Sequence, residues 1–222
     1  MGHTNALIIA SVTAVLKRLL DNALAQQFAQ TPVGTMTVTA LPPDRIPTGA
    51  EEITQLNLYL YRITPNLGGP MGIRPLATQS QEPREETYSL ALNLHYLLTA
   101  YGEHDFQAEI LLGSAIQFFQ ALPILSPTLF RTTLATLTSG NTDDSTSALL
   151  TDLASSPFIE TFPSLKITPE FLSMEDLSRI WSSLQTRARP TMTYQVSTIL
   201  ITKGSDNIVP PAASEKTQVK TP

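Results

Sequence analysis

Alternating hydrophobic positions mark residues 88–98 as the strand around which the rest of the chain is organised. Six large side chains fall on one parity of this segment: Tyr88, Leu90, Leu92, Leu94, Tyr96 and Leu98. A period of two is typical of a strand with one covered face, because a helix would scatter the same side chains around its surface. Their burial would contribute on the order of 10 kcal/mol, at roughly 1.5–3 kcal/mol each. The pattern predicts a central strand whose second face is solvated or lies against another backbone.

Other segments also have the composition of strands. One of them, Ile53 to Ile63, alternates leucines with polar and aromatic residues, as in a strand that is covered on both faces. Further strands are predicted at Thr35 to Thr39, Phe162 to Thr168 and Met192 to Lys203. Because Met192 to Lys203 is the last strand and leads into a polar tail, we expect it to lie at a sheet edge that is open to strand addition.

Hydrophobic residues at helical spacing predict three main helices, at residues 5–29, 105–122 and 173–186. A shorter helix is expected at 125–137, where Ser126-Pro127 places proline at the first helical position. Residues 140–147 are polar and predict a loop, and 147–155 predict one or two further helical turns.

The helix starts carry capping signals. We expect Asp105 to cap the second main helix and Ser173 to cap the third, which begins with the Ser-x-x-acid pattern of a capping box. Trp181 lies on the apolar stripe of the third helix and should be a buried anchor. Gly113 inside the second helix costs about 1 kcal/mol relative to alanine, which predicts the close approach of another backbone.

Together these elements predict an α+β fold. We expect a single mixed or antiparallel sheet of about five strands, flanked by three main helices and contained in one domain at residues 1–203. Residues 204–222 have no hydrophobic pattern and are rich in Pro, Ala, Ser, Lys and Thr, so they predict a flexible C-terminal tail.

The segment Thr64 to Thr87 stands apart because it is long and has no periodicity. Its prolines and glycines argue against a regular element: Pro65, Gly68, Gly69, Pro70, Gly72, Pro75 and Pro83. Connections longer than about 12–15 residues are uncommon inside compact domains and are either functional or disordered. Our hypothesis is that this loop orders against a neighbouring subunit, with plain disorder as the alternative.

The composition narrows the class of protein. With 222 residues, 42% of them hydrophobic, the chain can bury a core. Only 15% of residues are charged and the net charge is −5, which favours an assembly component and argues against nucleic acid as the main ligand. The apolar run at residues 6–16 is too short to span a bilayer, so we expect no membrane insertion. The absence of cysteine excludes disulfides and thiolate chemistry.

No catalytic motif stands out. The three histidines, His3, His95 and His104, are not spaced as metal ligands. His104-Asp105 fits a turn better than part of a triad, because no Gly-x-Ser-x-Gly elbow exists. The glycines at 68, 69 and 72 lack the spacing and the lysine of a phosphate loop. We therefore expect no enzyme activity, no cofactor and no metal site.

Four stretches in order resemble one protein family. They are Asn57 to Asn66, Leu90 to Tyr101, Ala108 to Gly113 and Trp181 to Tyr194. The chain resembles the N-terminal domain of the cap, or tail-terminator, protein of extracellular phage-tail-like contractile injection systems of the antifeeding-prophage type. The resemblance covers most of residues 5 to 203. One departure is Ala188-Arg189-Pro190-Thr191, where the family tends to have Tyr-Arg-Pro-Ser.

The resemblance implies a structural role and a fold like that of phage tail terminators. It implies a homohexameric ring on the distal end of the inner tube that ends tube and sheath polymerisation and attaches the last sheath layer. The partners would be the chain itself, the inner-tube protein and the sheath protein. Assembly would be cytoplasmic, and the particle would be released or membrane-associated. Candidate interface residues are Arg62, Pro65, Asn66, Leu67, Arg74, Arg189, Pro190 and Tyr194.

A different class of function also fits the sequence. A small α+β adaptor or ligand-binding domain, acting as a monomer or dimer, would show the same motif-poor pattern. The two functions differ in oligomeric state, so a mass measurement in solution and in particles separates them.

Overall fold

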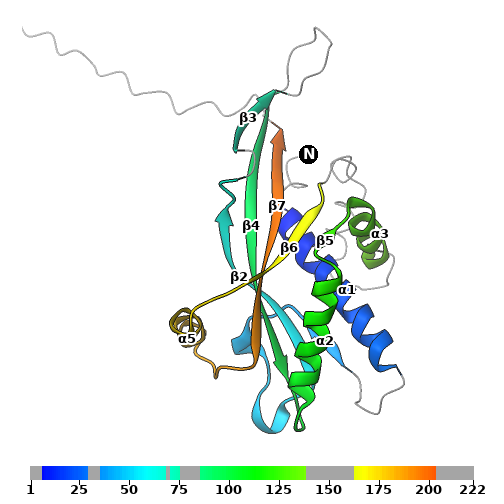
Figure 1. Cartoon of the computed structure of the whole chain (residues 1–222), viewed down its shortest axis with the longest axis vertical. Helices are drawn as coiled ribbons and strands as arrows, with labels where there is room; N and C mark the ends of the chain where they lie inside the picture. The colour runs from blue at the N-terminus through cyan, green and yellow to red at the C-terminus, as the bar shows by residue number, and fades with distance from the viewer. Residues whose placement is uncertain (1–6, 30–35, 69–70, 76–85, 139–162, 204–222) are drawn as a thin grey trace, which may run out of the picture.

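The computed structural model describes residues 7–29, 36–68, 71–75, 86–138 and 163–203. In these ranges the chain forms one sheet of seven strands, in the order β1-β2-β4-β7-β6-β5, with β3 also paired to β4 (Figure 1). The strands are β1 (Thr37–Thr39), β2 (Gln55–Pro65), β3 (Met71–Pro75), β4 (Glu86–Tyr101), β5 (Ile124–Leu125), β6 (Leu165–Glu170) and β7 (Thr191–Lys203). Only the β1–β2 pair is parallel. The predicted α+β class with a single mixed sheet is confirmed.

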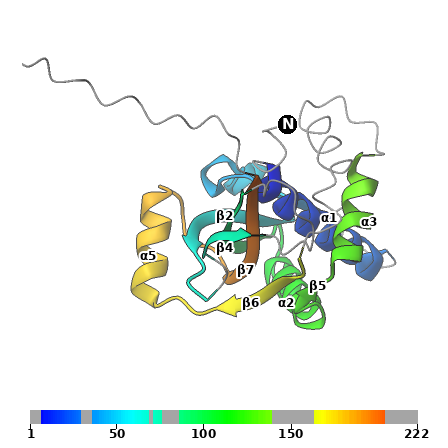
Figure 2. The same ribbon diagram turned by 90° about the horizontal axis from the view of Figure 1, so that it is seen from above.

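Helices cover the two faces of the sheet unequally. They are α1 (Ile8–Phe28), α2 (Gln107–Ala121), α3 (Pro127–Thr138) and α5 (Met174–Ser183). Helices α1, α2 and α3 lie together on one face, whereas α5 lies alone on the other (Figure 2). We call these the three-helix face and the α5 face. The main hydrophobic cluster lies between the sheet and the three helices.

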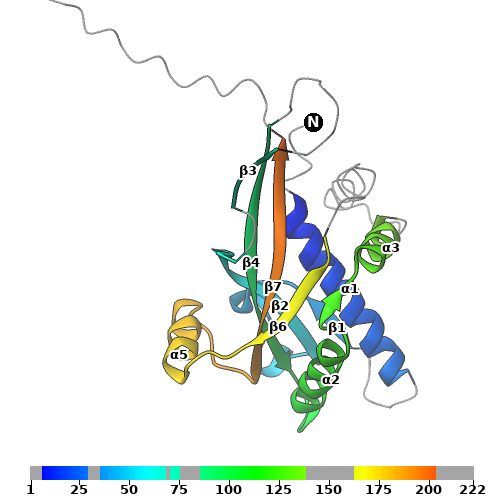
Figure 3. The ribbon, with the colours of Figure 1, turned by 45° about the horizontal axis from the view of Figure 1, so that its top comes forward.

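Strand β4 is the predicted central strand. It pairs with β2 and β3 on one side and with β7 on the other. Leu92, Leu94, Tyr96 and Leu98 are buried toward the three helices, as the alternation predicts. Leu90 is 39% exposed, so its expected burial was wrong. The reason is visible in Figure 3, where the β4–β7 pair continues past the upper end of α1, α2 and α3.

The second face of β4 is more covered than the sequence predicts. Ala91, His95 and Leu97 are all buried on this parity. The leucine opposes Tyr59 on β2 and Thr193 on β7. The α5 face therefore has a small buried layer of its own. The sequence predicted that this face is either solvated or packed against another backbone, and neither alternative includes such a layer.

Helix α1 packs as its pattern predicts. Its buried side chains are Ile8, Ser11, Val12, Val15, Leu16, Leu20 and Leu24. The Thr13 hydroxyl and the Tyr96 hydroxyl lie 2.8 Å apart and hydrogen-bond. This bond satisfies the polar end of a tyrosine that is otherwise buried in the core, and burial raises its pKa. One polar contact thus fixes the helix against the central strand.

Helix starts were predicted with mixed success. Ser173 caps α5 by accepting a hydrogen bond from the Asp176 N–H at 3.1 Å, and Trp181 is buried, as expected. Pro127 is the first residue of α3, also as expected. Asp105 does not cap α2, because the helix begins after Phe106, whose left-handed backbone (φ 68°) turns the chain without a side-chain cap.

Three further expectations were wrong. A β-carbon added at Gly113 would meet no atom within 4 Å, so no backbone approaches it. The segment Thr64 to Thr87 includes β3, which pairs with β4 in spite of its proline and glycine. Strand β7 is not an edge strand, because it lies between β4 and β6. Short strands such as β3 and β5 carry too few residues to show a period, and pairing with a longer neighbour stabilises them.

Several predictions lie outside the described residues. They concern the start of the first helix before residue 7, the segments 140–147 and 147–155, and the tail at 204–222. Within the described ranges, none of the helices is both long and apolar enough to cross a membrane.

We predict that Leu94→Asp prevents folding. Leu94 has no exposed surface, so the carboxylate would be buried without a partner and cost about 4 kcal/mol or more. The matched control is Leu90→Asp, on the same strand and parity but 39% exposed, which should cost about 1 kcal/mol or less. Urea unfolding followed by circular dichroism measures both. Equal stability of the two variants would contradict the burial pattern of β4.

Candidate functional site

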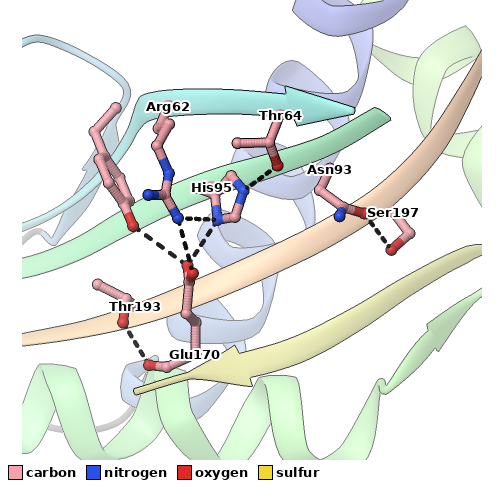
Figure 4. Close-up of polar contacts among 8 residues, drawn as sticks. Arg62, Thr64, Asn93, His95, Glu170, Thr193 and Ser197 are labelled. Carbon is pink, nitrogen blue, oxygen red and sulfur yellow. Dashed lines mark hydrogen bonds and ion pairs between the residues drawn. The ribbon is translucent and has the colours of Figure 1, made fainter. Parts of the chain in front are cut away.

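A cluster of polar side chains crosses the α5 face of the sheet. It contains Tyr61, Arg62 and Thr64 from β2, His95 from β4, and Glu170 from the end of β6. We call it the Glu170 cluster, because this carboxylate is its hub. Figure 4 shows Arg62, His95 and Glu170 pointing toward one another across the strands.

Glu170 accepts three hydrogen bonds. One oxygen, Oε2, lies 2.8 Å from Nδ1 of His95 and accepts from the Tyr61 hydroxyl at 3.3 Å. The other, Oε1, lies 3.2 Å from an Arg62 guanidinium nitrogen. The His95 side chain is buried and Glu170 is largely so. A carboxylate that is largely withdrawn from water requires such partners, so the three donors stabilise its charge.

His95 uses both ring nitrogens. Because Nδ1 faces a carboxylate that only accepts, it carries a proton and donates. Nε2 lies 2.8 Å from the Thr64 hydroxyl, which can donate to the neutral ring or accept from the charged one. Both nitrogens are satisfied in either state. The ring therefore acts as a fixed brace between Thr64 on β2 and Glu170 on β6.

A β-bulge in β2 places Arg62 in this cluster. The register shifts between Leu60, which opposes Tyr96, and Arg62, which opposes His95. Without the bulge, strict alternation would send Arg62 to the three-helix face beside Leu60. The bulge instead puts Tyr61 and Arg62 on the same face. The Arg62 guanidinium then lies 5.8 Å from the centre of the Tyr61 ring.

The environment of Tyr61 changes its acidity. Burial raises its pKa to about 12, and the nearby Glu170 carboxylate adds to this effect while Arg62 opposes it. The ring meets His95 edge to face, with the centroids 6.1 Å apart. Tyr61 is therefore a neutral hydrogen-bond donor to Glu170 throughout the neutral pH range.

The order Thr64–His95–Glu170 has the contacts of a proton relay, but we interpret it as structural. His95 is buried beneath its partners, and a relay would need a substrate site beside the hydroxyl and donors for a developing oxyanion. No group of three or more potential metal ligands occurs in the part of the chain that the structure describes. The cluster's evident effect is to tie β2, β4 and β6 together across β7.

A second charged cluster lies where β7 begins. Arg189 forms an ion pair with Glu52 at 2.6 Å, and its guanidinium lies 5.6 Å from the centre of the Tyr101 ring. The other Glu52 oxygen accepts from the Gly102 N–H at 3.3 Å. Next to Arg189, the Pro190 carbonyl accepts from the Ala100 N–H at 3.2 Å. We call this the Arg189 cluster, and it fixes the start of β7 to the end of β4.

The predicted interface residues fall into three separate places. Arg62, Pro65, Asn66 and Leu67 gather at the end of β2, where the Asn66 N–H bonds the Ala91 carbonyl at 2.9 Å and Leu67 is strongly exposed. Arg74 lies in β3, which pairs with β4 near the same end. These residues share one end of the sheet.

The remaining predicted residues lie at the other end of β7 or in the core. Arg189 and Pro190 belong to the Arg189 cluster. Tyr194 is buried and packs on Phe119, with the ring centres 4.6 Å apart. Its side chain is therefore covered within the subunit, and its place among the interface residues stays a prediction.

Sequence reasoning missed Glu170, His95 and Glu52. His95 was visible as a polar residue in a strongly apolar strand, which is the kind of signal that marks a buried polar network. Glu170 and Glu52 gave no such signal, because each lies near a strand end where charged residues are common. Their partners come from distant parts of the chain, so only the fold reveals the two clusters.

The chain matches one family model and is similar to solved structures. The family model of the Pvc16 N-terminal domain matches residues 11–215. One similar solved structure is the PVC sheath/tube terminator of an extracellular contractile injection system in the extended state, with 13% identity and a TM-score of 0.46 over 92% of this chain and 63% of that chain. Another is the anti-feeding prophage cap, a tube terminating cap, with 16% identity and a TM-score of 0.45 over 89% and 60%. The chain thus spans less than two thirds of either solved chain. No protein of curated function matches it.

We predict that Glu170→Ala lowers the free energy of unfolding by about 1–3 kcal/mol, because it leaves the buried His95 Nδ1–H without an acceptor. The matched control is Glu175→Ala on α5, which removes an exposed i,i+4 pair with Arg179 and should cost about 0.5 kcal/mol or less. Chemical unfolding at neutral pH measures both. If the two variants lose equal stability, the Glu170 cluster does not brace the sheet.

We also predict an alkaline loss of stability through Tyr61. The unfolded tyrosine ionises near pH 10, whereas the folded one keeps its proton up to about pH 12. The stabilisation is therefore complete below pH 10 and is lost as pH rises from 10 to 12. In Tyr61→Phe, stability should fall less steeply over this range than in the wild type. Identical slopes in urea unfolding across this pH range would argue against the raised pKa.

Proposed function

The chain belongs to the Pvc16 N-terminal domain family, and from this membership we propose that it caps a phage-tail-like contractile injection particle. The proposal extends to this chain the role for which its two solved relatives are named, a sheath/tube terminator and a tube terminating cap. The family match over residues 11–215 is the observation that carries it. The protein ends polymerisation of the inner tube and of the sheath.

We further propose that the cap is a homohexameric ring. In this proposal, residues 1–203 form the domain that builds the ring. The ring contacts the inner-tube protein and the last layer of sheath protein. Its role is structural, without catalysis, cofactor or nucleic acid, and it assembles in the cytoplasm before the particle is released or becomes membrane-associated.

The Leu67 end of the sheet is the proposed contact with the tube or with a neighbouring subunit. This end carries Arg62, Pro65, Asn66 and Leu67, and β3 with Arg74 lies beside it. The exposed leucine and Leu90 on the neighbouring strand give it an apolar character that solvent does not favour. The end of β2 and strand β3, which belong to the segment Thr64 to Thr87, lie at this end, and we propose that the segment orders against a partner.

The part of β7 that is open to strand addition by a sheath subunit is shorter than the sequence predicts. Strand β6 pairs with β7 only as far as Ser197. Among the described residues, positions 198–203 of β7 pair with β4 alone. An extended segment of a sheath subunit can add to this edge through backbone hydrogen bonds. We place sheath attachment there.

Deletion of the protein from a producing strain tests the proposed function. We predict tubes of uncontrolled length and sheaths that detach or contract early, because nothing ends the tube or holds the terminal sheath layer. Electron microscopy of purified particles measures tube and sheath lengths, and expression of the protein in trans is the control that should restore them. Particles of normal, uniform length with a stable extended sheath would favour the monomeric or dimeric adaptor instead.

A further inference from the structure

The connection between β6 and β7 is a long excursion that is held at both of its ends. Residues 171–190 leave the sheet after Glu170 and return at Thr191. The Glu170 cluster ties the start to β2 and β4, and the Arg189 cluster ties the end to Glu52 and β4. We call residues 171–190 the α5 arm. The ion pairs of these two clusters give the α5 arm a defined position although α5 lies alone on its face (Figure 2).

The α5 arm presents apolar side chains to solvent. Phe171 is 88% exposed and Met174 is 83% exposed. Trp181 is buried, so α5 already turns its apolar side to the protein. The exposed Phe171 and Met174 therefore add nothing to the buried core. The exposed acid Glu175 is the next residue of the helix, where it pairs with the equally exposed Arg179. An anchored element that displays an apolar pair beside a negative charge is typical of a protein-binding surface.

A second apolar surface lies at the β5 edge of the sheet. Ile124 is 58% exposed and pairs directly with the exposed Lys166 of β6. The next residue, Ile167, is buried toward the three helices, so alternation places Lys166 and Ile124 on the α5 face. Lys166 forms no ion pair with any residue of the described ranges. We call Ile124 and Lys166 the β5 edge surface.

The two surfaces are complementary and lie at opposite ends of β6, on the same face of the sheet. The arm offers apolar groups beside a carboxylate, and the edge offers an apolar group beside an ammonium. Figures 1 and 2 both show α5 and β5 at opposite ends of β6. A head-to-tail ring requires two different surfaces that match and do not overlap. A two-fold dimer would instead require one surface that matches itself.

We propose that the α5 arm of one copy docks on the β5 edge surface of the next copy, with Phe171 and Met174 against Ile124 and with Glu175 near Lys166. This contact repeats around the ring. The inference rests on the proposed ring and names the contact that closes it. The apolar groups supply affinity by leaving water, and the charge pair sets the direction in which subunits join.

Two double variants test the contact. The arm variant is Phe171→Ser/Met174→Ser, and the edge variant is Ile124→Ser/Lys166→Glu. All four side chains are exposed, so both variants should keep the circular dichroism and melting behaviour of the wild type. Neither should form rings, whereas the wild type does. The matched control, Ile110→Ser/Ile116→Ser, removes two exposed apolar residues of α2 and should form normal rings.

Mixing the two variants gives the sharpest result. The edge variant keeps an intact arm and the arm variant keeps an intact edge surface, so the mixture should form a 1:1 dimer that cannot close. Mass photometry and light scattering measure the masses in solution, and the number of copies on purified tube ends is measured in parallel. Rings from either variant alone, or a mixture that stays monomeric, would overturn the contact.

A charge exchange tests the direction of docking. Lys166→Glu and Glu175→Lys should each raise the concentration for half-assembly about tenfold, and the combination of both should restore it.

Failure of the proposed function and failure of the proposed contact are distinguishable. If the wild type itself forms no ring in solution or on tubes, the proposed function fails and this inference fails with it. If the wild type forms rings and no variant disturbs them, only the contact is wrong.

Discussion

The structure depends on the burial of β4 between two long strands and beneath α1 and α2. Leu94, Tyr96 and Leu98 have no exposed surface, and their burial removes more apolar area from water than any shorter strand can. Strands β2 and β7 pair with β4 over most of their length and thereby inherit its register. Once β4 is placed, the positions of the bulge, of β6 and of both charged clusters follow.

Polar interactions stabilise the parts of the sheet that the hydrophobic core does not cover. The α5 face has only a small buried layer, so Glu170, His95 and Arg62 stabilise the junction of the outer strands by charge-assisted bonds. The Arg189 cluster does the same at the other end of the β6–β7 connection. These clusters have a common consequence, because they position an arm that the hydrophobic core does not hold. A surface element can then be rigid without being buried.

The distribution of exposed groups suits an assembly component better than an isolated domain. Among the described residues, large apolar side chains are exposed at several separated places, including Leu67, Ile124 and Phe171. A monomer gains nothing from them, since each would be more soluble as a polar residue. A subunit in a closed ring needs one surface for each neighbour and others for the tube and the sheath. Family membership and the exposed apolar side chains therefore favour the same proposal, a subunit of a capping ring, by independent arguments.

The sequence alone determined those features that depend on local period and on turn chemistry. The alternation in residues 88–98 identified β4, the helical stripe identified α1, and Ser173 identified the start of α5, since each signal is carried by neighbouring residues. Four ordered stretches also sufficed to identify the family. Tertiary structure alone decided the rest. Leu90 is exposed because the helical layer ends, Arg62 reaches Glu170 because a bulge reverses its face, and β7 is internal because β6 returns beside it. Glu170 and His95 are 75 residues apart in the chain, and no local pattern reports a contact that only the folded sheet creates.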